Sequence, residues 1–209
     1  MTKIPKILKL LFFNQIWNLP NAENTVYLTF DDGPTPEITE KVLEILEKHQ
    51  IKATFFCIGD NVRKYPEIVQ KIISKHHSVG NHTYSHLKGW KTPTKTYISN
   101  TEACEIKLNS LFKIHNSKLF RPPYGKITPW QSYKLRQLGY KIIMWEVLSK
   151  DYDVNLSPET CYENVVNNVT TGSIIVFHDS VKAQKNMLNS LEKTIETLKS
   201  KGFKFEKIA

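Results

Sequence analysis

Apolar positions along the chain follow two different periodicities. Short runs rich in β-branched and aromatic residues alternate with longer segments in which apolar residues recur every three or four positions. The short runs predict strands at residues 26–30, 53–58, 78–81, 118–121, 141–147, 173–177 and 203–208. The longer segments predict helices at residues 36–49, 66–75, 94–115, 129–138, 158–169 and 182–201. Strict alternation implies parallel strands with helices outside, hence an α/β fold. Seven such units favour a closed or nearly closed barrel over an open sheet.

Chemically unusual residues follow these strands at their carboxyl ends. In a barrel of parallel strands this is the face on which active sites are built, whereas the opposite face and the interior carry stability. We therefore expect one functional site at this face. Its candidate residues are Asp31 and Asp32 after the first strand, His82 and His86 after the third, Arg121 to Gly125 after the fourth, Asp151 after the fifth, and His178 and Asp179 after the sixth.

A metal ion would explain the adjacent carboxylates Asp31 and Asp32, which follow an apolar run. Two unpaired carboxylates side by side are costly to desolvate, and they repel each other. The pair His82 and His86 would place two imidazoles one helical turn apart on one face. Two imidazoles and one carboxylate leave a tetrahedral position open, which is typical of catalytic zinc. Taken separately, the two carboxylates could form a simple turn and the two histidines a polar helix face.

Composition indicates a single domain. The chain has 209 residues, of which 40% are apolar and 23% charged, and it contains no repeat or low-complexity linker. The formal net charge of +9 could attract an anionic partner, but no nucleic-acid-binding motif accompanies it. We expect a solvated basic surface and no nucleic acid partner. Three widely spaced cysteines imply no disulfide framework, and Cys57 is expected in the core.

Residues 1–25 form a basic segment that precedes the expected domain at residues 26–209. Ile4, Leu8 and Leu11, with lysines between them, predict an amphipathic helix packed on the domain. The apolar run is too short to span a bilayer, and no signal-peptide cleavage site follows it. Weak contact with a membrane surface stays open. We expect a monomer in a cytoplasmic or peripherally membrane-associated location.

Four motifs resemble those of the polysaccharide deacetylases, the carbohydrate esterase family four that includes nodulation-type chitooligosaccharide deacetylases. They are Thr29-Phe30-Asp31-Asp32-Gly33-Pro34, His82-Thr83-Tyr84-Ser85-His86, Arg121-Pro122-Pro123-Tyr124-Gly125 and Val176-Phe177-His178. The resemblance covers nearly the whole chain from residue 26. It implies a distorted (β/α)7 barrel, one divalent metal ion and the hydrolysis of acetyl groups on glycans. Zinc is the expected metal, with cobalt or manganese as alternatives.

The resemblance implies a role for each of the matching residues. Asp32, His82 and His86 would hold the metal, and Asp31 would be the base that activates water. Arg121 would keep Asp31 ionised and oriented, since a neighbouring guanidinium favours a carboxylate.

The remaining roles concern the acyl group and the leaving group. The backbone N–H of Tyr124 would help to hold the tetrahedral oxyanion. His178 would protonate the departing amine as general acid, and Asp151 would hold the imidazolium of His178. The expected substrate is an N-acetylglucosamine-containing glycan, either a chitin-like oligosaccharide or peptidoglycan.

Three positions depart from the family pattern. Leu148 stands where an Asp is usual, Tyr152 where a Trp forms a wall of the acetyl pocket, and Val176 where Leu is usual. The metal, base and acid positions are intact, so these changes bear on substrate preference. Two alternatives stay open: an O-acetyl esterase acting on xylan-like glycans at the same site, and a non-catalytic glycan-binding protein.

Overall fold

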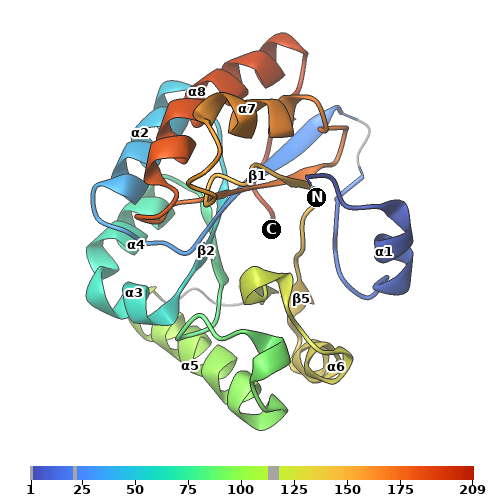
Figure 1. The fold of residues 1–209 in the computed structure, drawn as a ribbon. Coiled ribbons are helices and arrows are strands. Elements are labelled where there is room, and N and C mark those ends of the chain that lie inside the picture. Colours follow the sequence, from blue (N-terminus) through green and yellow to red (C-terminus); the bar gives the residue numbers. More distant parts are fainter. Residues whose placement is uncertain (1, 21–22, 113–117) are drawn as a thin grey trace.

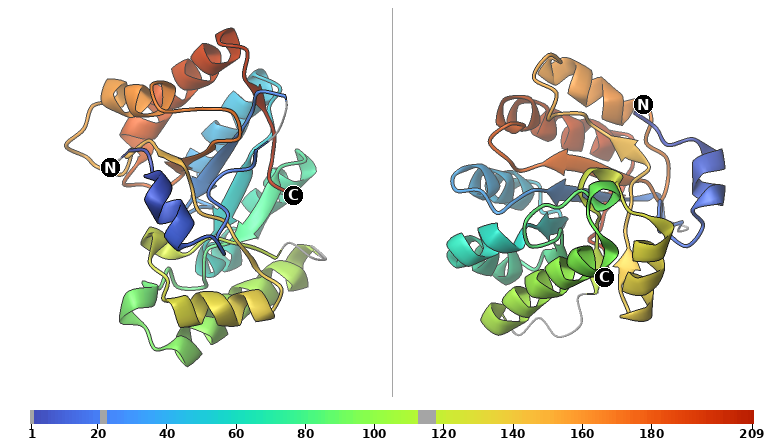
Figure 2. Two further views of the ribbon diagram at one scale, coloured as in Figure 1. Left: turned by 90° about the vertical axis from the view of Figure 1, so that its right-hand side faces the viewer. Right: turned by 60° about the horizontal axis from the view of Figure 1, so that its bottom comes forward.

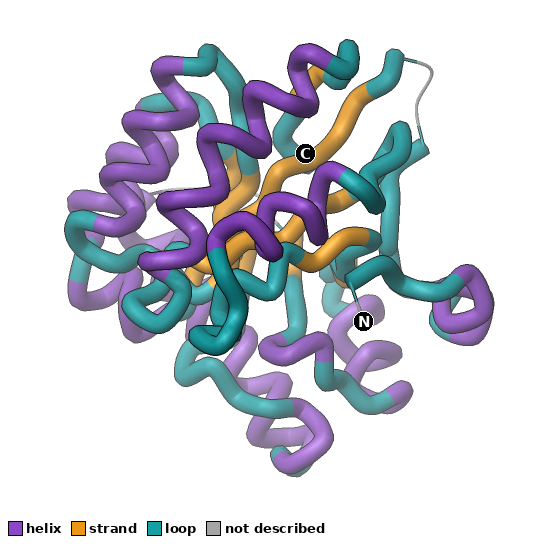
Figure 3. Tube along the Cα trace, turned by 45° about the horizontal axis from the view of Figure 1, so that its top comes forward, coloured by secondary structure: helices purple, strands orange, loops and turns teal. Residues whose placement is uncertain are grey.

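A curled parallel β-sheet runs through the centre of the molecule, and helices cover its outer face (Figures 1 and 3). The computed structural model describes residues 2–20, 23–112 and 118–209. Hydrogen bonds join the strands in the order β5-β4-β3-β2-β1-β7-β6, and β8 pairs with β1 beside this path. The strands are β1 Thr25–Asp31, β2 Thr54–Cys57, β3 Ser78–Asn81, β4 Leu119–Phe120, β5 Lys141–Ile142, β6 Val147–Leu148, β7 Ile174–His178 and β8 Lys204–Phe205. The predicted α/β architecture is confirmed.

Most helices lie where the periodicity predicted them. They are α1 Lys6–Leu11, α2 Ile38–Lys48, α3 Gly59–Lys64, α4 Pro66–Ser74, α5 Thr94–Phe112, α6 Pro129–Gln137, α7 Pro158–Val166 and α8 Gln184–Ser200, with short 3-10 turns η1 Gly89–Lys91 and η2 Pro123–Gly125. The prediction missed α3, which is too short to show a period. It also started α2 too early, because Glu37 occupies the N-cap position and its N–H donates to Glu40. Residues 113–115 of the predicted helix 94–115 lie outside the described residues.

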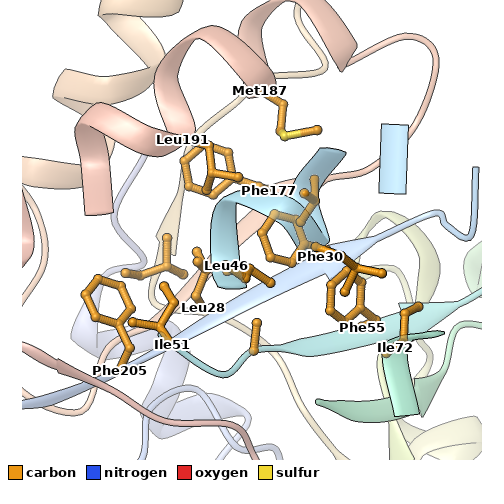
Figure 4. Packing of buried hydrophobic residues seen from close by; sticks show 14 of the residues in the cluster. Leu28, Phe30, Leu46, Ile51, Phe55, Ile72, Phe177, Met187, Leu191 and Phe205 are labelled. Atoms are coloured by element: carbon orange, nitrogen blue, oxygen red, sulfur yellow. The ribbon is translucent and has the colours of Figure 1, made fainter. Parts of the chain in front are cut away.

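Successive side chains of β1 point alternately to the hydrophobic core and to the opposite face of the sheet, where the candidate site lies. Leu28 and Phe30 point to the helix side, where Phe30 stacks on Phe55 and tilts against Phe177 (Figure 4). Thr29 and Asp31 point to the other face of the sheet. One face of the strand therefore stabilises the fold by apolar burial, while the other carries polar groups into the barrel.

The predicted strand at residues 141–147 is broken into β5 and β6. The carbonyl groups of Ile143 and Met144 accept hydrogen bonds from the buried Arg121 guanidinium and so cannot pair within the sheet. The N-terminal segment bonds to the flanking positions: the Ile16 N–H donates to Ile142, and the Met144 N–H donates to the Ile16 carbonyl. The chain on either side of α1 thus pairs along this break, with Lys3 bridged to Val147 and Ile16 to Ile143, while α1 itself stands beside the sheet (Figure 2).

The N-terminal helix α1 differs from its predicted orientation. Ile4 and Leu8 face the domain, but Leu11 is 65% exposed, so its expected packing is wrong. The physical reason is that Lys9 takes an inward position, where it pairs with Glu146. In the described part of the chain, no helix combines the length and the apolar character that crossing a membrane requires.

Candidate active site

Asp32, His82 and His86 converge at the carboxyl end of the sheet. The Nε2 atom of His86 lies 3.1 Å from Oδ1 of Asp32, and the Nε2 atom of His82 lies 3.6 Å from it. One side-chain ligand atom from each residue falls within 4.8 Å of the other two. Two nitrogen donors and one oxygen donor at this spacing fit a single divalent cation of the zinc type.

The two histidines do not lie on a helix, and that part of the prediction is wrong. They belong to an irregular loop after β3, in which Thr83 and His86 have positive φ angles of 63° and 54°. The side chains of Asn81 and Asn100 accept the loop N–H groups that a helix would have used, including those of Thr83 and Tyr84. The four-residue spacing is therefore served by a strained loop rather than by a helical face.

The surroundings of His82 prepare it as a neutral ligand. The Nδ1 atom of His82 lies 2.8 Å from the Arg121 carbonyl oxygen, to which it donates, so Nε2 carries the lone pair toward Asp32. Burial lowers the pKa of His82 to about 4, which keeps the ring neutral near pH 7. Burial opposes the charged form of Asp32, but the His86 hydrogen bond and the positive charge of His178 outweigh it and hold the pKa of Asp32 well below its usual range. The donor set thus fits the metal that the sequence predicted.

Asp31 faces the same space and is bound to the most deeply buried cation. Nη1 of Arg121 donates to Oδ1 of Asp31 at 2.8 Å and to the Thr29 hydroxyl at 2.7 Å. Arg121 has no exposed surface, and its guanidinium lies 4.1 Å from the centre of the Phe56 ring. Such a guanidinium fixes both the orientation and the charge of its carboxylate. Asp31 is therefore held as an oriented anion next to Asp32.

His178 and Asp151 form the opposite charged pair. Nδ1 of His178 donates to Oδ1 of Asp151 at 2.8 Å, and the His178 backbone N–H donates to Oδ2 at 2.7 Å. Burial disfavours the imidazolium, but the Asp151 carboxylate outweighs burial and raises the pKa of His178 to about 9. The ring is therefore protonated at pH 7, with Nε2–H as its remaining donor. His178 pairs with Asp31 in the register of β1 and β7, which brings these two side chains to one edge of the sheet.

Asp179 is a buried acid near the site for which the sequence suggested no role. Its Oδ1 accepts the Gly33 N–H at 3.1 Å, and its Oδ2 accepts the Thr39 hydroxyl at 2.5 Å. Burial raises its pKa to about 7. The sequence pattern that drew attention to Asp31, an acidic residue at the end of an apolar strand, also applies to Asp179. Asp179 ties the turn that carries Asp32 to the end of β7.

A cavity of about 360 Å³ joins these groups. Asp31, Asp32, His82, His86 and His178 all line it. The predicted wall residues Tyr124, Tyr152 and Val176 line it as well, together with Leu148, Trp145 and Lys182. Trp145 and Lys182 were missed: an aromatic residue at the end of an aliphatic run was a usable signal for Trp145, whereas one lysine among many gave none.

Tyr124 takes an unusual backbone conformation at the rim. Its φ angle is 59°, and its ring lies 4.6 Å from that of His86. The N–H groups of Gly125 and Lys126 donate to carbonyls of the same turn, whereas the Tyr124 N–H has no acceptor among the described residues. A backbone donor left free beside the ligand cluster could serve an oxyanion.

Comparison with known proteins identifies relatives over most of the chain. The family model for polysaccharide deacetylase matches residues 18–143, which is more than half of the sequence. A peptidoglycan-N-acetylglucosamine deacetylase of Bacillus cereus is 37% identical over 187 residues, covering 89% of this chain and 67% of that protein. A chitooligosaccharide deacetylase of Azorhizobium caulinodans is 32% identical over 169 residues, covering 79% and 78%.

Solved structures share the fold. The crystal structure of a peptidoglycan N-acetylglucosamine deacetylase in complex with an aryl hydroxamic acid superposes with a TM-score of 0.90 at 34% identity, covering 97% of this chain and 94% of that one. This match confirms the predicted (β/α)7 barrel. A protein of Bacillus anthracis described as a pseudoenzyme of carbohydrate esterase family four has a TM-score of 0.83 at 25% identity, covering 93% and 67%. The fold alone therefore does not establish catalysis, which depends on the side chains at the site.

Proposed function

This chain belongs to the polysaccharide deacetylase family, and we propose that it removes N-acetyl groups from an N-acetylglucosamine-containing glycan, either peptidoglycan or a chitin-like oligosaccharide. The observation that carries the proposal is that the ligand group Asp32, His82 and His86, the carboxylate Asp31 and the imidazolium His178 line one cavity. The named activities of the relatives support the substrate class.

Asp32, His82 and His86 would hold a divalent cation, with zinc as the expected ion and cobalt or manganese as alternatives. When bound, such a cation supplies Lewis acidity to an acyl carbonyl and lowers the pKa of water. Because all three side chains line the cavity, a cation held by them would act on a substrate bound there. The donor set resembles that of catalytic rather than structural zinc sites.

Asp31 would act as the base. Its ion pair with Arg121 keeps the carboxylate anionic, and Oδ1 is engaged by the guanidinium while the carboxylate lines the cavity. A proton leaves the attacking water for Asp31 as the oxygen bonds to the acetyl carbon. Arg121 has no second carboxylate partner among the described residues, so Asp31 alone neutralises its charge.

His178 would complete the reaction as the acid. Its protonated ring can give the Nε2 proton to the departing nitrogen as the carbon–nitrogen bond breaks, which yields acetate and a free amino sugar. The Asp151 carboxylate keeps Nδ1 protonated and directs Nε2 into the cavity. The Tyr124 N–H would stabilise the oxyanion formed between these two steps.

The non-catalytic alternative requires the loss of a ligand, base or acid, and none is lost here. The O-acetyl esterase alternative uses the same groups but depends less on His178, because an alcohol is a better leaving group than an amine. The test is acetate release from a panel of N-acetylglucosamine oligomers, peptidoglycan fragments and acetylated xylan, with Asp31→Asn as the inactive control. Acetate from the amino-sugar substrates supports the proposal. Release from xylan alone, or from no substrate with metal present, would refute it.

A further inference from the structure

Helix α1 and the turn after it expose a group of large apolar side chains. Ile7 is 61% exposed, Leu10 70%, Leu11 65% and Phe13 76%. Helix α1 stands at the side of the molecule, away from the sheet (Figures 1 and 2). Four large apolar side chains so close in the sequence are an unusual exposed group for a helix that already packs on the domain, and such groups mark binding surfaces.

Lys3 and Lys9 of this segment turn inward instead. Nζ of Lys3 donates to the Asn168 carbonyl at 2.8 Å, and Lys9 forms an ion pair with the nearly buried Glu146. Glu146 also accepts a hydrogen bond from the Ser173 hydroxyl at 2.7 Å. These polar anchors fix the orientation of α1, so its apolar exposure follows from the fold and not from loose packing.

An apolar groove of about 230 Å³ lies beside this helix. Leu8 and Phe12 contribute to it from the N-terminal segment, and Trp90 and Ile127 contribute from the loops around η1 and η2. The Trp90 indole N–H donates to the Ile127 carbonyl at 3.1 Å, which fixes that ring.

The groove adjoins the catalytic cavity, since Tyr124 and Trp145 line both. Gly125 makes this possible, because a Cβ atom at that position would lie 2.6 Å from the Trp145 ring. A ligand whose sugar lies in the catalytic cavity can therefore extend into the groove past these two rings.

The chemistry of the groove suits hydrocarbon better than sugar. Besides the Tyr124 hydroxyl and the Trp145 indole N–H, only Gln15 and Lys126 offer side-chain polar atoms that are not already bonded, so the hydroxyls of a second sugar would find few partners. Each methylene buried in an apolar site strengthens binding about fourfold. Lys126, over the Trp90 ring, and Lys88, near Tyr124, have no ion-pair partner among the described residues and would favour an anionic linker.

We propose that this groove binds the hydrocarbon chain of an amphiphilic substrate, an N-acetylated amino sugar linked to a lipid. The exposed apolar face of α1 lies beside the groove. In this proposal it contacts the lipid surface that holds the substrate. This inference rests on the proposed function, because it assumes that the sugar occupies the catalytic cavity.

The test compares methyl and hexyl glycosides of the N-acetylglucosamine disaccharide, below the concentration at which the hexyl compound aggregates. For the wild-type protein, kcat/KM is expected to rise at least about tenfold from methyl to hexyl, mainly through KM. Leu8→Asn, and separately Phe12→Ser, should reduce that rise to less than about threefold while leaving the methyl rate unchanged. Ile106→Asn, at an exposed position on α5, is the matched control and should keep the full rise.

A binding measurement separates this inference from the proposed function. Tryptophan fluorescence of the metal-free protein, titrated with the same glycosides, should show tighter binding of the hexyl compound that both groove variants lose. Equal rates and equal binding for the two glycosides would overturn the inference and leave the deacetylase function standing. Concentration-dependent dimerisation that Leu8→Asn abolishes, without a chain-length effect, would also overturn it, in favour of a second copy of this chain as the occupant.

Discussion

Gly33 lies so close to Asp179 that a Cβ atom on residue 33 would stand 2.0 Å from the Oδ2 atom of that carboxylate. The contact joins the turn after β1, which carries Asp32, to the end of β7, which carries His178. It also leaves the Gly33 N–H aimed at Oδ1 of Asp179. The turn that carries Asp31 and Asp32 is thus supported by Gly33, which no residue with a Cβ atom could replace without displacing the Asp179 carboxylate.

Gly33→Ala should weaken metal binding more than it affects the rest of the fold. The methyl group must push Asp179 away and shift Asp32, and loss of such support typically costs 10- to 100-fold in metal affinity. Titration calorimetry with Zn²⁺ measures the effect. Gly139→Ala is the control: no atom lies within 4 Å of the added Cβ, and the strain of an alanine at a φ of 86° falls on a turn that does not line the cavity, so zinc affinity should not change. Zinc affinity in Gly33→Ala equal to that of the wild-type protein would contradict this role of the contact.

Arg121→Met should destabilise the protein strongly. The substitution leaves Asp31 buried without its cation, and breaking a buried pair from one side costs about 3–5 kcal/mol. For a domain of this size the melting temperature should fall by about 10 °C. Arg63→Met is the matched control, since its pair with Asp60 is exposed to solvent and contributes little to stability. Equal melting temperatures for the two variants would show that Arg121 does not stabilise the barrel through Asp31.

Metal content should depend on the ligand cluster. Purified protein is expected to hold about one zinc-like ion per chain, to lose activity with a chelator and to regain it with Zn²⁺ or Co²⁺. His86→Ala should remove the ion, as measured by elemental analysis. His49→Ala should not, although His49 and two glutamates form another group of possible ligands. If His86→Ala retains the ion and His49→Ala loses it, then the metal is bound by His49 and the two glutamates instead.

The fold followed from the sequence because its dominant signal is simple. Buried parallel strands and amphipathic helices alternate with clear periods, and the polar residues at the strand ends had to share one face. The break between β5 and β6 could not be foreseen. It arises because Arg121 takes the carbonyls of Ile143 and Met144, and a contact across the barrel leaves no mark in the local pattern.

The sequence predicted which residues make up the site, but it did not predict the local backbone geometry that positions them. The spacing of His82 and His86 suits a helix. The side chains of Asn81 and Asn100 nevertheless hold the segment between the two histidines in a loop, because they accept its backbone N–H groups. The orientation of α1 was misjudged for a related reason. Apolar residues lie on more than one face of α1, and the ion pair of Lys9 with Glu146 determines which face packs on the domain.

Tyr152→Trp should alter substrate preference and leave the metal site alone. Tyr152 lines the cavity and meets the His178 ring edge-on at 5.1 Å, while it is not among the metal ligands. A larger ring without the hydroxyl narrows the acetyl-binding region, so relative rates on formyl, acetyl and propionyl amino sugars should change. Zinc affinity should equal that of the wild-type protein. Identical relative rates across the series would remove Tyr152 from the pocket wall.

The ionisation of His178 should set the alkaline limit of activity and part of the stability. Asp151 raises the folded-state pKa of His178 to about 9 from 6.5. The pair therefore contributes full stability below about pH 6.5, and the contribution is lost as pH rises through about 9. On an amide substrate kcat/KM should fall over the same upper range, because the acid loses its proton. In His178→Gln, the difference in unfolding free energy from the wild-type protein should shrink between pH 6.5 and 9. A difference independent of pH would show that the pair is not charged.

The acid and the base should be distinguishable by leaving group. Asp31→Asn removes activation of the water, so it should slow amide and aryl-ester substrates together, by about 10²- to 10⁴-fold. His178→Ala removes protonation of the departing group, so it should cause a loss of that size for the amide and only a small loss for the ester, whose phenolate leaves unaided. The measurement is kcat/KM for both substrates in both variants, with metal content checked by elemental analysis. If His178→Ala slows the two substrates equally while the metal is retained, then His178 does not donate the proton, and another group lining the cavity must supply it.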